Sequence, residues 1–102
     1  MNGEQQAQQV AKPVDKNEAA WARATRQNER EKKQVGANVK HWRGERGWTV
    51  RELADRAGMS IAYVFMVEGG QREMSGKYLH RMANALRVSP ATLRAFPEKM
   101  PF

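Results

Sequence analysis

The chain of 102 residues contains no cysteine. This excludes a disulfide framework and a thiolate metal site, and it fits a reducing cytoplasm. The longest apolar run, residues 61–67, is far shorter than the about 20 residues that a membrane-spanning helix needs. No N-terminal stretch has the apolar centre of a signal peptide. We therefore expect a cytoplasmic protein that makes no membrane contact.

The sequence also lacks the groups of residues that catalysis requires. His41 and His80 are isolated and have no partners at metal-ligand spacing. No serine lies in a nucleophile elbow, and the pair Gly69-Gly70 is better explained as a helix stop than as a phosphate-binding loop. We expect no enzymatic activity, no metal and no cofactor.

Positive charge is in clear excess and is unevenly distributed. The chain has 18 basic and 11 acidic residues, a formal net charge of +7. Residues 1–34 hold seven basic and five acidic residues, whereas residues 35–102 hold eleven and six. A basic globular part indicates a polyanionic partner, although charge informs on association and not on fold.

Residues 1–34 differ in pattern from the rest and form an N-terminal arm. Residues 1–14 are Gln-rich and polar, and we expect them to be disordered. Residues 15–34 begin with a capping-box-like Asp15 and Glu18, contain no Gly or Pro, and have Trp21 as their one large apolar residue. Such a segment can form a helix that is marginal alone. Residues 97–102 form a short tail.

From residue 35 the apolar spacing becomes that of amphipathic helices. Val35, Val39 and Trp42 follow the i, i+4, i+7 spacing of one helix face. Thr49, with Glu52 three residues later, predicts a capped second helix. No segment alternates convincingly with period two, so we expect an all-α domain of five short helices over residues 35–96. The last three helices follow the N-cap candidates Ser60, Ser75 and Ser89, the last with Pro90 at N1.

The second and third helices have the residues of a helix-turn-helix, two short helices that cross through a tight turn. Ala54 is small where the helices cross, and Gly58 tolerates the positive φ that the turn needs. The expected buried positions on both sides of the turn are Leu53, Met59, Val64 and Val67.

Residues 35–96 resemble the lambda-repressor-like, or Xre/Cro, helix-turn-helix domain. The resemblance depends on Val35-Gly36, Arg43, Glu45-Arg46-Gly47, Leu53-Ala54, Gly58-Met59-Ser60, Tyr63-Val64, Val67-Glu68, Gly70-Gln71-Arg72 and the run Leu79 to Ser89. It implies a five-helix, sequence-specific double-stranded DNA-binding domain of a bacterial or phage transcriptional regulator. It further implies a homodimer, a repressor as one possible role, and a location with the bacterial nucleoid.

The resemblance also implies roles for individual residues. Residues 61–68 become the recognition helix that enters the major groove, and Arg43 and Glu68 become a structural pair. The implied base-reading residues are Ile61, Ala62, Tyr63 and Met66. The implied phosphate contacts are Thr49, Arg51, Gln71 and Arg72. Val50 occupies a position where many family members have Gln, so one polar contact is missing.

The recognition helix is unusual because it has no Arg, Asn or Gln, the residues that normally form bidentate bonds with bases. Three explanations stay open. Apolar side chains can contact thymine methyl groups, helped by Tyr63 and by DNA shape. The arm can read a groove through cations of residues 23–33, namely Arg23, Arg26, Arg30, Lys32 and Lys33.

In the third explanation the exposed helix face is a protein-binding patch, as in an antitoxin-like or anti-repressor module. Its residues would be Ile61, Ala62, Phe65 and Met66. A regulatory protein partner fits either function. For a homodimer, we expect a contact surface on the fifth helix and the tail, with Leu93, Phe96 and Phe102 available.

Overall fold

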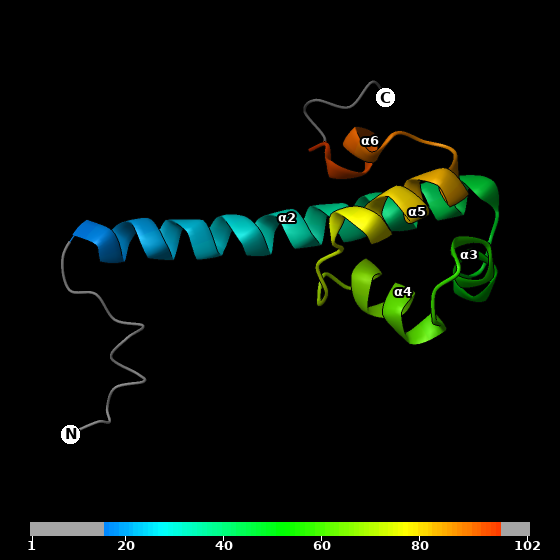
Figure 1. Ribbon diagram of the computed structural model, residues 1–102, viewed down its shortest axis with the longest axis horizontal. Helices are drawn as coiled ribbons and strands as arrows, with labels where there is room; N and C mark the ends of the chain where they lie inside the picture. Colours follow the sequence, from blue (N-terminus) through cyan, green and yellow to red (C-terminus); the bar gives the residue numbers. More distant parts are fainter. Residues whose placement is uncertain (1–15, 97–102) are drawn as a thin grey trace.

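The structure is a computed structural model that describes the backbone of residues 16–96 and the side chains of residues 25–96. Within this range the secondary structure is entirely helical and contains no strand, which confirms the all-α expectation (Figure 1). The five helices are α2 (Lys16–Arg46), α3 (Val50–Ala57), α4 (Ile61–Glu68), α5 (Gly76–Leu86) and α6 (Pro90–Arg94). The segment expected to be disordered, residues 1–14, and the tail, residues 97–102, lie outside the described residues.

The first helix, α2, is not short as we expected. It has 31 residues, about 46 Å at 1.5 Å per residue, and it passes without a break through the expected boundary between residues 34 and 35. No Gly or Pro interrupts residues 17–34, so nothing local ends the helix before the domain begins. Its N-terminal half extends beyond the other helices, and residues 25–31 are exposed (Figure 1).

The core is formed where the C-terminal half of α2 meets the other four helices. Helix α2 packs against α4, α5 and α6, and α3 packs against α4 and α5. The fully buried large side chains come from every helix, as expected for one continuous core. They are Val39, Leu53, Val64, Val67, Met82, Leu86 and Leu93. Val35, Trp42 and Met59 pack at the edge of this cluster.

Leu93 corrects the expectation for a dimer surface. We expected Leu93 to be available on the fifth helix, but it is fully buried inside the monomer. Phe96 is half-buried, and the Arg30 guanidinium lies 4.2 Å from its ring centroid. Phe102 lies outside the described residues. Helix α6 has only five residues, and its one large apolar side chain, Leu93, packs into the core of the monomer.

A buried polar residue that the sequence did not reveal holds α6 in place. The side-chain amide of Asn38 donates to the carbonyl oxygens of Leu93 at 2.9 Å and Ala95 at 2.7 Å, and it accepts a hydrogen bond from Gln34 at 2.9 Å. Carbonyl groups at a helix end have no intrahelical partner. Asn38 therefore satisfies the end of α6 from a position on α2.

In the part of the chain that the structure describes, no helix combines the length and the apolar character needed to cross a membrane. Helix α2 is long enough, but all ten of its residues 25–34 are polar or charged.

Candidate nucleic-acid interface

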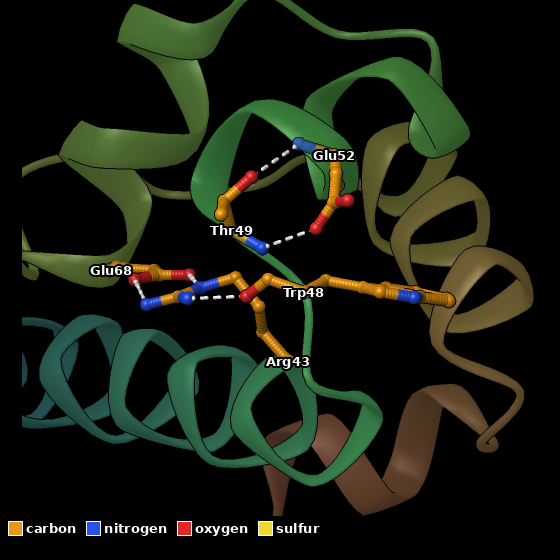
Figure 2. Close-up of polar contacts among 5 residues, drawn as sticks. All are labelled: Arg43, Trp48, Thr49, Glu52 and Glu68. Carbon is orange, nitrogen blue, oxygen red and sulfur yellow. Dashed lines mark hydrogen bonds and ion pairs between the residues drawn. The ribbon is translucent and has the colours of Figure 1, made fainter.

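Helices α3 and α4 are each fixed by local hydrogen bonds at their start. The Thr49 hydroxyl accepts from the Glu52 backbone N–H at 3.1 Å, and the Glu52 carboxylate accepts from the Thr49 N–H at 2.8 Å, a complete capping box (Figure 2). The Ser60 hydroxyl accepts from the Tyr63 N–H at 3.0 Å and caps α4. Between them Gly58 has a φ of 69°, the left-handed conformation that the turn requires. The expected helix-turn-helix is therefore formed.

Arg43 joins three elements beneath this helix pair. Its guanidinium donates to both carboxylate oxygens of Glu68, at 2.7 and 3.0 Å, and to the Trp48 carbonyl at 2.8 Å (Figure 2). The Arg43 side chain is 17% exposed and that of Glu68 only 8%. The hydrogen bond to Glu68 raises the pKa of Arg43 above its usual value, although burial acts in the opposite direction. The pair was expected to be structural, and its contacts are those of a structural pair.

The backbones of α2 and α4 approach very closely at Gly36. A Cβ atom at this position would lie 2.1 Å from the Val67 carbonyl oxygen. One turn earlier in α2, Lys33 lies against Gly70, which follows the end of α4. Together with the Arg43–Glu68 pair, these contacts hold the C-terminal end of α4 rigidly against α2.

The outward face of α4 is apolar. Phe65 is 69% exposed and Ile61 is 39% exposed, and both belong to the few large apolar side chains that the described residues leave exposed. Ala62 is exposed beside them, whereas Met66 is half-buried. Of the four expected base-reading residues, Ile61 and Ala62 thus face solvent most openly. Phe65 was absent from that set, but the sequence placed it on the exposed helix face as part of the alternative protein-binding patch, and its exposure agrees with that expectation.

Tyr63 and Tyr78 are neighbouring aromatic rings with a guanidinium on either side. The Tyr63 ring centroid is 5.2 Å from that of Tyr78 on α5 and 5.2 Å from the Arg72 guanidinium. The Arg81 guanidinium lies 5.2 Å from the Tyr78 ring. Burial raises the pKa of Tyr63 above its usual value, with the charge of Arg72 acting against it. The ring is held in one orientation at the edge of the exposed face.

The expected phosphate contacts surround the start of α3 and the end of α4. Thr49, Arg51, Gln71 and Arg72 are all exposed. The capping box already uses the backbone N–H groups of Thr49 and Glu52. The first-turn N–H groups left without an intrahelical acceptor are those of Val50 and Arg51. An anion at this helix end would therefore be bound by these two N–H groups and by the Arg51 side chain.

The cations of the arm are spread along the exposed part of α2. Arg26 and Lys33 are exposed, Lys32 pairs with Glu29 at 3.0 Å, and Arg30 covers Phe96. Arg23 belongs to the part of α2 whose side chains are not described. Among the arm cations whose side chains the structure describes, Lys33 lies against Gly70, just after the end of α4. Within residues 16–96 no group of three or more His, Asp or Glu side chains could hold a metal ion.

Helices α3 and α4 are both capped, are joined by a turn with a left-handed glycine, and pack on a helical core. This arrangement defines the helix-turn-helix class of proteins. Residues 34–96 match the family described as Helix-turn-helix domain, and the chain belongs to this family. The predicted resemblance to lambda-repressor-like domains is confirmed.

Relatives and solved structures agree with this assignment. The chain is 35% identical to an uncharacterized HTH-type transcriptional regulator, y4dJ of Sinorhizobium fredii, over 70% of this chain and 92% of that protein. It resembles the crystal structure of a hypothetical transcription factor, NHTF from Neisseria (TM-score 0.65, 28% identity, 68% of this chain and 79% of that chain). It also resembles the restriction-modification controller protein C.AhdI from Aeromonas hydrophila (TM-score 0.59, 31% identity, 61% and 94%). These relationships make the chain a DNA-binding transcriptional regulator.

Proposed function

We propose that this protein is a sequence-specific regulator of the Xre/Cro type, from a bacterium or a phage, that binds double-stranded DNA with α4 in the major groove. The observation that carries the proposal is the construction of α4. Its buried side is fixed on α2 by the Gly36 contact and the Arg43–Glu68 pair, while its other side faces solvent. A rigid, exposed, capped helix is what major-groove reading requires.

In this proposal Ile61, Ala62, Tyr63 and Met66 contact base edges. The phosphate contacts are Thr49, Arg51, Gln71 and Arg72, all of which are exposed. Substituting Ile61 or Met66 by Ala should change the preference at particular base pairs, because base contacts specify and phosphate contacts position. If both variants kept the affinity and the preference of the parent protein, the major-groove assignment of α4 would be wrong.

Arg72 offers a test of the phosphate contacts with a matched control. Arg72→Ala should weaken binding to all DNA sequences alike and reduce the slope of log K against log salt by about 0.9, the value for one phosphate of B-DNA. Arg87→Asn is the control, because Arg87 is exposed at the C-terminal end of α5, the end away from Arg72, and asparagine tolerates its positive φ. An equal loss in both variants would show a general charge effect and would remove Arg72 from the interface.

The arm is proposed as a second DNA contact, through Arg23, Arg26, Arg30, Lys32 and Lys33. Residues 16–34 belong to one helix with the domain, so an arm contact would extend the footprint in a fixed direction. Arg26→Gln in the full chain should then weaken DNA binding, whereas Gln27→Ala, its exposed neighbour, should not. Unchanged affinity in Arg26→Gln would argue that the arm is passive at this position.

The functional unit is proposed to be a homodimer that represses transcription in the bacterial cytoplasm at the nucleoid. One domain offers a small reading surface, and two half-sites about one helical turn apart enlarge it. Selection from a random DNA pool tests binding and symmetry together. A palindromic consensus supports the proposal, and failure to enrich any sequence would contradict it.

The second candidate function is a protein-interaction module, and the exposure of Phe65 favours it, because large exposed apolar side chains often mark protein contacts. Salt separates the two functions. DNA binding should weaken steeply with salt, by a log–log slope of about −0.9 for each neutralised phosphate, whereas a contact built from Ile61 and Phe65 should respond weakly.

A further inference from the structure

The exposed face of α4 has a shape and chemistry of its own. Ile61 and Phe65 are four residues apart, about one helical turn, so they lie on the same face of α4. Ala62 is exposed beside Ile61. Phe65 is 69% exposed, although it belongs to a helix whose Val64 and Val67 are fully buried. Its ring contributes nothing to the monomer core, so the core does not explain a phenylalanine here.

Most polar groups in and next to α4 form hydrogen bonds within the protein. The Glu68 carboxylate is bound by Arg43, and the Ser60 hydroxyl accepts from the Tyr63 N–H. The carbonyls of residues 65, 66 and 67 accept from the N–H groups of residues 69, 71 and 70. The polar side-chain group of α4 that these contacts do not use is the Tyr63 hydroxyl, whose ring is held between Arg72 and Tyr78.

In the major groove the apolar group that a base pair presents is the C5 methyl of thymine. We infer that Phe65, flanked by Ile61 and Ala62, contacts thymine methyl groups and makes this protein a reader of methyl positions and not of hydrogen-bonding edges. The inference rests on the proposed function, since it requires α4 to lie in the major groove.

The charge around this face favours DNA over an apolar protein surface. The exposed cations of α3, α5 and the turn after α4 are Arg51, Arg56, Arg72, Lys77 and Arg81, and they outnumber the exposed acids of these segments, Glu52, Asp55 and Glu73. Glu68, the acidic residue of α4, is neutralised by Arg43. An apolar strip bordered by cations complements a groove whose floor carries methyl groups and whose walls carry phosphates.

The test uses the full-length protein and the operator obtained from the random pool. Each thymine is replaced singly by deoxyuridine, which keeps every hydrogen-bonding group of the base and removes only the methyl. Loss of one buried methyl should weaken binding about 4-fold, from about 0.8 kcal/mol per buried carbon. Thymines inside each half-site should respond, and thymines outside the footprint serve as controls.

Phe65 variants show whether this residue makes the contact. In Phe65→Ala, replacement by deoxyuridine should no longer weaken binding at the positions that Phe65 contacts, whereas Phe65→Leu should keep part of the response. The high exposure of Phe65 means that neither change should lower the thermal midpoint appreciably, and circular dichroism verifies this.

The outcomes distinguish this inference from the proposed function. If the operator is bound but no thymine responds to deoxyuridine, methyl reading is overturned while DNA binding stands. If thymines respond equally in the parent and in Phe65→Ala, the role of Phe65 is overturned. If no operator is enriched and Phe65→Ala abolishes a salt-insensitive protein contact, the proposed function itself fails.

Discussion

At the scale of the residue, Arg43 fixes the position of α4 relative to α2. Its guanidinium contacts the last residue of α4 and the carbonyl of Trp48, one residue before the cap of α3 (Figure 2). A planar guanidinium can form these bonds at once, because its donors point in several fixed directions. One side chain on α2 thereby sets the positions of both helices of the motif.

We expect Glu68→Gln to destabilise the fold by about 3 kcal/mol, because it leaves the largely buried Arg43 charge without its counter-charge. Glu29→Gln is the matched control: Glu29 pairs with Lys32, but its side chain is 55% exposed, so the change should stay within about 0.5 kcal/mol. Denaturant unfolding of both variants measures the difference. Equal effects would mean that the Arg43–Glu68 pair contributes no more than a surface pair.

Replacing a glycine of α2 by alanine should have opposite effects on stability at Gly36 and at Gly44. Gly36→Ala should destabilise the protein by about 2–3 kcal/mol, since the new Cβ would overlap the Val67 carbonyl oxygen and force the helices apart. Gly44→Ala should stabilise it by about 0.5–1 kcal/mol, because Gly44 has nothing within 4 Å and alanine is the better helix former. Thermal unfolding compares the two; a stabilised Gly36→Ala variant would contradict the close approach of α2 and α4.

At the scale of the element, α2 and α4 are opposite cases. Residues 25–31 of α2 are polar and exposed, and local pairs such as Lys32 with Glu29 and Gln27 with Glu31 stabilise this part of the helix. Such pairs contribute only about 0.2–0.5 kcal/mol each. Helix α4 is short and apolar on two sides, and it depends on its cap and on packing against α2. The arm can therefore unwind without the domain, whereas α4 cannot.

We predict that Gln27→Pro unwinds the turns of α2 that precede residue 27 and leaves the domain folded, because proline removes a helical hydrogen bond and its ring clashes with the preceding turn. Far-ultraviolet circular dichroism should show a loss of helix, while the thermal midpoint stays near that of the parent. Gln27→Ala, at the same exposed position, should retain the helix. A large fall of the midpoint in the proline variant would mean that the arm supports the core.

At the scale of the whole molecule, the protein combines a net charge of +7 with a single small reading helix. The charge supplies attraction to DNA of any sequence, and one eight-residue helix reads few base pairs. In the proposed homodimer, two copies on a palindrome would enlarge the reading surface. Since Leu93 is buried in the monomer core, contacts between copies would have to use other surfaces.

If two copies bind one operator, the spacing of the half-sites must match the DNA helix. We predict that inserting about 5 bp between half-sites, half a turn, abolishes joint binding, and that inserting about 10 bp partly restores it, because the helical repeat is about 10–10.5 bp. Electrophoretic mobility shifts on the three duplexes provide the measurement. Unchanged affinity with the 5-bp insertion would show that each chain binds DNA independently.

Most of the fold followed from the sequence, because the signals that begin and end these helices are local. Thr49 with Glu52, Ser60 with Tyr63 and the left-handed Gly58 each involve contacts within three or four residues. Local spacing also indicated the helix-turn-helix, whereas the Arg43–Glu68 pair, 25 residues apart, was expected only from the resemblance to lambda-repressor-like domains. Ser75 is an instructive exception: it lies at the N-cap of α5 without forming a side-chain cap bond.

The sequence by itself thus determined the helices and the class of protein. The tertiary structure alone decided the contacts between distant segments: Leu93 is in the core, and the Tyr63 ring lies between Arg72 and Tyr78. It also decided that the arm and the first helix of the domain are one helix. The physical reason is that a cap depends on neighbours in sequence, whereas the burial of Leu93 and the contacts of Tyr63 depend on which distant surfaces pack together.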